Sequence, residues 1–163
     1  MEYHFKKEEY NWGDRFYIYD AFGNKIYYIK SSILLWNRKF EICDLNKNTL
    51  MEIKNEPKSP IKKKFYICLG KEKFASITKE ISIIPKYTFE GIDCEMIGVM
   101  QHDYKLVSKG NELLSITFES TSWGHHPVVT IHKSSNELLM LALALTLSYV
   151  MNAREDTSST THL

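Results

Sequence analysis

Features that would place the chain in several common protein classes are missing from its sequence. The 163 residues include three cysteines, an odd number with no C-x-x-C pair, which suits reduced thiols rather than a disulfide framework. Lysine and arginine number 21 and aspartate and glutamate number 20, so neither sign of charge is in sufficient excess to attract nucleic acid. The opening residues MEYHFKKEEYNWGD contain no apolar run of the kind that marks a secretory signal. We therefore expect a cytoplasmic protein that binds no nucleic acid.

The motifs of common enzyme classes are missing as well. The chain contains no G-x-S-x-G, no H-E-x-x-H, no P-loop and no G-x-G-x-x-G. Asp14, Asp20 and Asp44 fall at expected strand entries or turns, where aspartate is favoured. His125 and His126 are adjacent, and adjacent residues of a strand point to opposite faces, so we do not expect them to share a metal ion. The sequence predicts no catalytic residue, no metal site and no cofactor.

An internal repeat organises most of the chain. Its clearest copies are GDRFYIYDAFGNKIYYIK, NRKFEICDLNKNTLMEIK, KKKFYICLGKEKFASITK and HDYKLVSKGNELLSITFE, and weaker copies are PKYTFEGIDCEMIGV and GHHPVVTIHK. Each clear copy holds two alternating runs joined by a turn rich in Gly, Asn, Asp or Lys, which is typical of a β-hairpin. Period-two alternation places Phe16 and Ile18 on the inner face and Tyr17 and Tyr19 on the outer face. The repeats give about a dozen strands, and sheets of that width usually curl or close.

The segment SSNELLMLALALTLSYVMNAR is apolar on every side of a helix. Ser134 and Glu137 have the spacing of a capping box, which predicts a helix over about residues 135–151. The uncharged run from Leu138 to Met151 would extend roughly 21 Å, short of the ~30 Å hydrocarbon core of a bilayer, so we expect no transmembrane segment. A helix that is apolar all round must be enclosed by other parts of the protein.

A barrel of twelve strands has the dimensions to enclose this helix. Strands ~4.8 Å apart and tilted by about 40° leave a channel of about 14 Å, and a helix is about 10–12 Å across. We therefore predict a closed antiparallel β-barrel of about 12 strands around a hydrophobic C-terminal helix. The barrel and helix form one domain, 1–152, and the polar residues 153–163 are expected to be a disordered tail.

The pattern GD-F-I-Y-D--GN---Y-IK, followed by HDY-L and NELLMLALAL, resembles the LURP-one-related proteins. That family belongs to the tubby C-terminal-like superfamily, together with the phospholipid scramblases. The resemblance covers roughly residues 3–152 and implies a twelve-stranded barrel around a hydrophobic helix, but it implies no particular activity. In scramblases the stretch before the last helix is acidic and linked to calcium. Here WGHHPVVTIHKSSNE contains a single acidic residue, Glu137, so calcium control is not expected.

Three classes of function stay open after these observations. We expect first a non-catalytic binding or scaffold module that contacts a protein partner. The alternative is a cytoplasmic protein held peripherally at the inner membrane surface, which binds phospholipid or phosphoinositide or acts like a scramblase. The third is an enzyme with an unrecognised site. The sequence does not indicate an oligomeric state.

Two groups of residues are candidates for contact with an anionic lipid or a partner. The basic run PKSPIKKKF would attract anionic headgroups, and outward tyrosines suit a protein or membrane interface. The same residue types also suit a protected strand edge and cross-strand pairs, so both interpretations stay open. The candidates are Lys58, Lys62, Lys63, Lys64, Tyr17 and Tyr19.

Overall fold

In the computed structural model of this chain, twelve strands precede a single helix in the described residues, which are 1–10, 13–34, 37–56, 62–100, 102–121, 124–132 and 136–152. The helix α1 spans Glu137–Asn152. The strands are β1 (Glu2–Tyr10), β2 (Gly13–Asp20), β3 (Lys25–Leu34), β4 (Asn37–Cys43), β5 (Thr49–Glu56), β6 (Lys62–Leu69), β7 (Glu72–Glu80), β8 (Lys86–Glu90), β9 (Glu95–Ile97), β10 (Tyr104–Ser108), β11 (Asn111–Thr121) and β12 (Gly124–Ile131).

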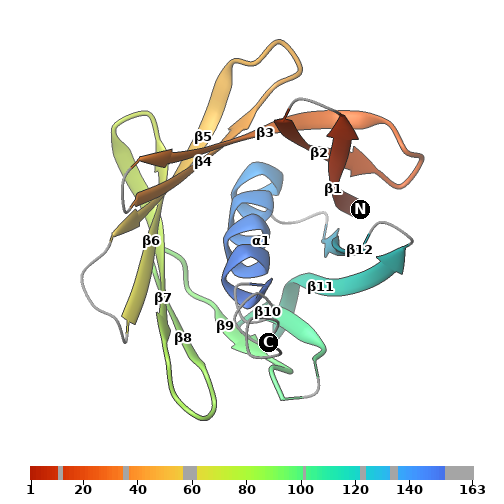
Figure 1. Cartoon of the computed structure of the whole chain (residues 1–163). Helices are drawn as coiled ribbons and strands as arrows, with labels where there is room; N and C mark the ends of the chain where they lie inside the picture. Colours follow the sequence, from red (N-terminus) through yellow and green to blue (C-terminus); the bar gives the residue numbers. More distant parts are fainter. Residues whose placement is uncertain are drawn as a thin grey trace, which may run out of the picture.

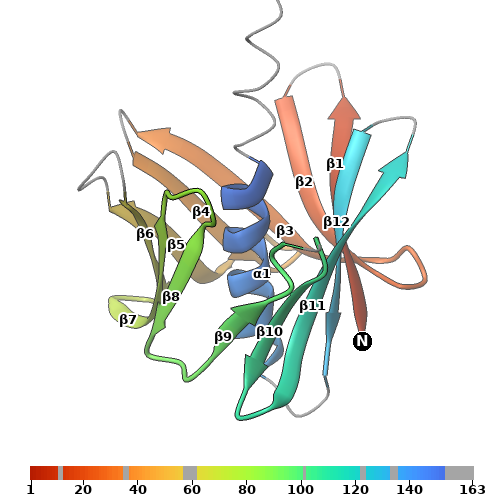
Figure 2. The same ribbon diagram turned by 90° about the horizontal axis from the view of Figure 1, so that it is seen from below.

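All twelve strands form one antiparallel sheet in the order β8-β7-β6-β5-β4-β3-β2-β1-β12-β11-β10-β9. The first strand, β1, pairs with the last, β12, so the two ends of the strand sequence meet in the middle of the sheet. The sheet rolls up until its edges β8 and β9 lie next to each other, although no ladder joins these two strands (Figures 1 and 2). The predicted barrel of about twelve strands is confirmed as a nearly closed barrel.

The helix α1 runs through the middle of this barrel (Figure 1). Every residue from Leu139 to Ser148 is buried, because strands surround the helix on all sides. The prediction of an enclosed helix is confirmed. Residues on the inner face of the wall alternate with outward residues, as the repeats predicted. Among these inward residues are Ile18, Phe40, Ile42, Ile53, Phe65, Ile67 and Ile77, each at most 7% exposed.

The N-terminal end of α1 differs in detail from the predicted capping box. The helix begins at Glu137, and the cap is Asn136, whose Oδ1 accepts a hydrogen bond from the backbone N–H of Leu139 at 3.2 Å. The predicted cap, Ser134, lies outside the described residues. Glu137 instead accepts a hydrogen bond at 2.6 Å from the hydroxyl of the buried Tyr3, and this contact ties the start of the helix to β1.

The C-terminal end of α1 is tied to the wall by a buried lysine. Lys79 of β7 points inward, is 6% exposed, and donates from Nζ to the backbone oxygen of Val150 at 3.1 Å. A cation at this position satisfies one of the last carbonyl groups of the helix and complements the negative end of its dipole. Hydrogen bonds from wall to helix therefore exist at both ends of α1.

Two hairpin turns show the internal repeat at atomic detail. In the β2–β3 turn, Asp20 Oδ1 accepts from the backbone N–H of Asn24 at 2.8 Å, and the Asn24 side chain donates to Oδ2 at 3.0 Å. Asp44 and Asn48 make the same pair of contacts in the β4–β5 turn, at 2.8 and 2.9 Å. The hydrogen bonds from these asparagines lower the pKa of both aspartates. Aspartate in these turns therefore has a structural role, as its placement predicted.

One weaker copy of the repeat does not form a hairpin. The segment PKYTFEGIDCEMIGV contains β8 and β9, which lie at opposite ends of the sheet order. Ile92 and Cys94 between them pack against the hydrophobic core, so the chain passes from one edge to the other instead of turning back. Gly91 permits this path, since its φ is +80° and a Cβ there would come within 2.3 Å of the backbone oxygen of Phe74.

Candidate functional site

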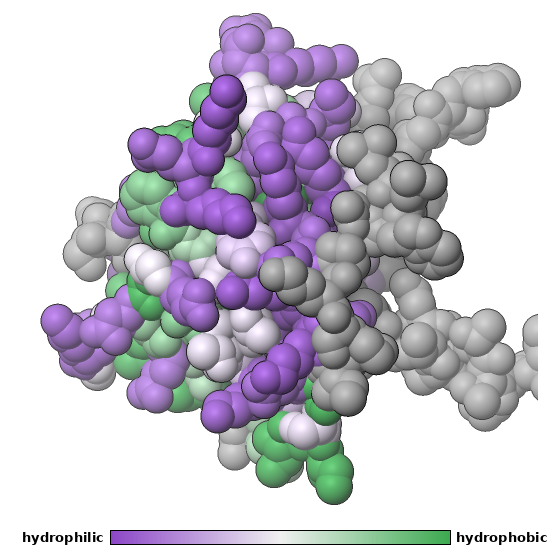
Figure 3. Space-filling model, turned by 90° about the vertical axis from the view of Figure 1, so that its left-hand side faces the viewer, coloured by the Kyte–Doolittle hydropathy of each residue, from purple (hydrophilic) through white to green (hydrophobic). Residues whose placement is uncertain are grey.

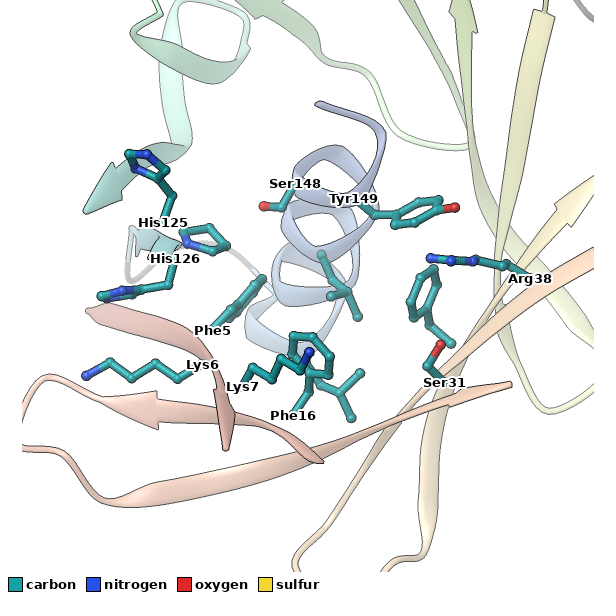
Figure 4. Close-up of a pocket in the computed structure, with 14 residues that line it drawn as sticks. Phe5, Lys6, Lys7, Phe16, Ser31, Arg38, His125, His126, Ser148 and Tyr149 are labelled. Atoms are coloured by element: carbon teal, nitrogen blue, oxygen red, sulfur yellow. The ribbon is translucent and has the colours of Figure 1, made fainter. Parts of the chain in front are cut away.

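A cavity of about 460 Å³ opens between the C-terminal half of α1 and the wall formed by β1–β4 and β12 (Figure 4). This volume is within the roughly 300–1,000 Å³ typical of small-molecule sites. The side chains that line it are mostly apolar or aromatic, with a few polar groups. The lining residues are Phe5, Lys6, Lys7, Phe16, Ile29, Ser31, Arg38, Phe40, His125, His126, Pro127, Leu145, Ser148 and Tyr149.

The cavity lies where the first and last strands separate. The ladder between β1 and β12 runs from the pair Glu2 and Thr130 to the pair His4 and Val128. After His4, the described ladders pair β1 only with β2. The inward residues Phe5 and Lys7 of this part of β1 line the cavity. On the other side of the gap, residues 125–127 of β12 line the cavity and pair with β11. The space is therefore produced by the strand register and not by a missing side chain.

Aromatic rings and a guanidinium group form one side of the cavity. Tyr149 of α1 packs edge-on against Phe40 of β4, with ring centroids 5.0 Å apart. The guanidinium carbon of Arg38 lies 4.8 Å from the centre of the Tyr149 ring, in a cation–π arrangement. Figure 4 shows Arg38 and Tyr149 pointing toward each other beside the cavity. A permanent cation is thus held next to an aromatic surface.

A buried hydroxyl without a hydrogen-bond partner belongs to Ser148, one of the residues that line this cavity. Ser148 is 3% exposed, and in the described part of the chain its Oγ is the one buried side-chain polar atom that lacks a partner. Thr146, two residues earlier, bonds back to the carbonyl oxygen of Ala142 at 2.8 Å, as such residues do in helices. Leaving a buried hydroxyl unpaired costs about 1–3 kcal/mol.

Apart from the phenol of Tyr149, the ionisable groups that line the cavity are basic. The lining residues in the described part of the chain include Lys7, Arg38 and His125 but no carboxylate and no thiol. His125 has its Nδ1 2.9 Å from the hydroxyl of Ser120. Figure 4 shows Lys7 directed across the cavity, whereas Lys6 points away from the helix. The site can therefore bind an anionic group beside an apolar body.

The outward tyrosines predicted from the sequence lie together on the barrel surface. The Tyr17 ring centroid is 6.3 Å from that of Tyr19 and 5.4 Å from that of Tyr28. Lysine ammonium groups cover these rings, with Lys25 4.2 Å from Tyr17 and Lys6 5.8 Å from Tyr19. Tyr28 joins the group because it is paired with Tyr17 in the β2–β3 ladder. We call this set of tyrosines and lysines the outer tyrosine cluster.

The basic run is not a concentrated positive surface in the described residues. Lys62 pairs with Glu80 at 3.1 Å, and Lys64 pairs with Glu90 at 3.5 Å. Lys63 stands between these two residues in β6, so its side chain points to the other face of the sheet. Its partner in the β6–β7 ladder is Lys79. Lys58 lies outside the described residues. Figure 3 shows the side of the barrel that is on the left in Figure 1, where hydrophilic residues are widespread and hydrophobic residues lie among them at the left and at the lower edge.

Two features of the structure were not found from the sequence. The inward direction of Lys79 depends on the register of β7 in the barrel, and the run ITKE alone does not indicate it. The other feature is a group on the outer wall whose ligand atoms lie close enough to hold a metal ion, formed by His4, Glu119 and His126. The prediction that His125 and His126 do not share a metal ion did not consider a partner from the first strand.

Comparisons with known proteins agree on the family and the fold. A family model described as LURP-one-related matches residues 1–155. An uncharacterized protein of Bacillus subtilis, YxjI, is 23% identical over 160 residues, which cover 97% of this chain and 98% of that protein. A crystal structure of a protein from Arabidopsis thaliana superposes with a TM-score of 0.59 over 91% of each chain at 9% identity. This last similarity concerns the fold alone. In the part of the chain that the structure describes, no helix is long and apolar enough to cross a bilayer.

Proposed function

The chain belongs to the LURP-one-related family, and from this premise we propose that it is a non-catalytic binding module whose cavity beside α1 takes an amphipathic anion. The ligand has an apolar body that packs against Phe5, Phe40 and Tyr149, and an anionic group that pairs with Arg38 at the cavity. A carboxylate or phosphate is the matching headgroup, since guanidinium groups bind both in bidentate fashion.

The observation that carries this proposal is the cavity of about 460 Å³, in which apolar and aromatic side chains lie beside the guanidinium group of Arg38. A ligand that fills this cavity would replace the void with packed contacts. The hydroxyl of Ser148, a residue of the cavity wall, has no hydrogen-bond partner among the described residues, but it is buried too deeply for a ligand to reach without a local shift. The same hydroxyl supports a non-catalytic role, because no described base lies within hydrogen-bond distance to activate it as a nucleophile.

Calorimetric titration with dodecanoate and with dodecanol tests the proposal. We expect dodecanoate to bind with one-to-one stoichiometry and dodecanol to bind more weakly, because only the acid pairs with Arg38. Arg38→Gln should weaken dodecanoate binding about tenfold or more, the usual scale for a lost hydrogen bond to a charged group. It should leave dodecanol binding unchanged. Lys62→Gln is the matched control, because Lys62 is a cation of the outer face that pairs with Glu80.

A second variant separates the cavity from the rest of the surface. Ser148→Phe places a ring in the cavity and should abolish binding of both ligands while the protein still unfolds cooperatively. If the Ser148→Phe protein binds dodecanoate as well as the unchanged protein does, then the ligand is elsewhere and the proposal is wrong. Equal affinity for dodecanoate and dodecanol would show that the cavity does not select an anionic headgroup.

The alternative function is binding at a membrane surface or to a protein partner through the outer tyrosine cluster. Tyr17, Tyr19 and Tyr28 with their lysines favour this surface over the basic run, since Lys62 and Lys64 pair with carboxylates. Co-sedimentation with vesicles that contain anionic lipid tests it. Binding that disappears in high salt and in a Tyr17→Ala, Tyr19→Ala variant, but persists in Ser148→Phe, would favour the alternative.

A further inference from the structure

Two histidines and a glutamate from three neighbouring strands meet on the outer wall of the barrel. His4 belongs to β1, His126 to β12 and Glu119 to β11. Glu119 lies directly opposite His126 in the β11–β12 ladder, and His4 lies diagonal to His126 because its own partner is Val128. The three residues share the outer face of the sheet, because His4 alternates with Tyr3 and Phe5, which are buried in the core, and because Glu119 and His126 are ladder partners. His126 also borders the cavity beside α1.

The distances within this group match those around a tetrahedral ion. His4 Nδ1 lies 3.4 Å from His126 Nε2, and His126 Nε2 lies 3.5 Å from Glu119 Oε2. Two ligands at about 2.0–2.1 Å from zinc, at a tetrahedral angle, are separated by about 3.3–3.4 Å. The three ligand atoms all lie within 4.8 Å of one another. The Glu119 side chain is 57% exposed, so it can rotate to complete the triangle.

A second carboxylate orients the first histidine. Glu2 Oε1 lies 2.8 Å from His4 Nε2, the ring nitrogen that does not face His126. Histidines that bind metal ions commonly donate their other N–H group to a carboxylate, which fixes the tautomer and makes the ligating nitrogen a stronger donor. Glu2 therefore leaves His4 Nδ1 with a lone pair directed toward His126 and Glu119.

The charged groups beside this cluster are of both signs. Lys6 repels an incoming cation, but Glu2 and Glu119 together supply two negative charges against this one positive charge.

We propose that His4, His126 and Glu119 bind one zinc-class divalent ion on the outer wall of the barrel, with Glu2 orienting His4. Two imidazoles and one carboxylate suit zinc and cobalt better than calcium or magnesium, which prefer an all-oxygen shell. Three protein ligands leave the fourth tetrahedral position open for water or for a group from a partner. The ion lies where the β1–β12 ladder ends, so it joins the two strands at the point where their hydrogen bonds stop.

The test is calorimetric titration of the chelator-treated protein with zinc chloride, together with cobalt absorption spectra. We expect one zinc ion per chain and visible cobalt bands of tetrahedral type without thiolate charge-transfer absorption. His126→Ala should abolish this binding. Glu2→Gln should weaken it by roughly 10–100-fold, as is typical for a group that orients a ligating histidine. His125→Ala is the matched control. The His125 side chain points to the opposite face of β12 from His126, and its Nδ1 lies 2.9 Å from the hydroxyl of Ser120, so zinc affinity should not change.

Two results would overturn the proposal. One is the absence of a one-to-one zinc complex in the unchanged protein. The other is equal loss of affinity in His125→Ala and His126→Ala, which would place the ion elsewhere. If His126→Ala fails to fold, Glu119→Gln replaces it, because that side chain is more than half exposed and its loss should not disturb the barrel. Zinc affinity in Glu119→Gln equal to that of the unchanged protein would also refute the assignment.

Discussion

Replacing Leu141 with alanine tests whether α1 is the core of this protein. Leu141 is 0% exposed and lies in the second turn of α1. The change removes three side-chain carbons, worth about 2.4 kcal/mol at ~0.8 kcal/mol per buried carbon. A cavity that the rigid wall cannot close adds about 1–2 kcal/mol. We expect the free energy of unfolding to fall by about 3–4 kcal/mol.

Leu145 provides the comparison within the same helix. It is 8% exposed and already lines the open cavity, so Leu145→Ala enlarges a space that solvent can reach. The cavity contribution is then small, and we expect a loss of about 2 kcal/mol. For a chain of this length, each kcal/mol corresponds to roughly 2–4 °C in melting temperature, so Leu141→Ala should melt roughly 6–16 °C lower.

Urea denaturation followed by circular dichroism measures both changes. Leu141→Ala should shift the midpoint without changing the slope, which would show lost stability in an unchanged fold. A change of less than about 1 kcal/mol would mean that the helix is not packed inside the wall. Leu141→Asp should prevent soluble folding, because it buries an unpaired carboxylate. A chain that ends at Lys133 should be insoluble or molten, and a cooperative transition from it would contradict the barrel assignment.

Three further changes test other contacts. Tyr3→Phe removes the donor to Glu137 and should cost about 1–3 kcal/mol in urea denaturation, because the carboxylate loses its partner, whereas no change would mean that water replaces the hydroxyl. The lowered pKa values of Asp20 and Asp44 contribute stability that is present above pH ~4 and is lost as the pH falls through the folded-state values, so Asp20→Asn with Asp44→Asn should flatten the fall of melting temperature in acid. An equally steep fall would place the acid sensitivity elsewhere. Removal of residues after Arg154 should leave the melting temperature unchanged, and a clear loss of stability would show that the tail packs on the barrel.

The architecture was predictable from the sequence because it depends on local patterns. Alternation marks each strand face, and a helix without a polar side requires an enclosure, so the barrel and its central helix follow from short stretches of the chain. The first strand lies outside the repeats, since EYHFKKEEY offers two inward residues, Tyr3 and Phe5, before a run of charges. The weak repeat containing β8 and β9 was misread as a hairpin, because the packing of Ile92 depends on the closed barrel.

The candidate sites depend on which strands become neighbours, and local sequence does not contain that information. His4 and His126 are 122 residues apart and meet because the first strand pairs with the last. The carboxylates that pair with Lys62 and Lys64 come from β7 and β8, so the charge of the basic run could not be judged from the run itself. The outward direction of Tyr17 was predictable from alternation alone.

The position of α1 after all twelve strands has a consequence for how the chain folds during synthesis. A ribosome releases the strands first, at about 5–20 residues per second, and the apolar inner faces have nothing to pack against until the helix emerges. Closure of the barrel also requires the first strand to find the last, a contact of very high sequence separation, which slows folding. The newly synthesised strands therefore pass through a stage in which their apolar faces and unpaired edges are exposed. Chaperone binding during translation would protect the chain from aggregation at that stage.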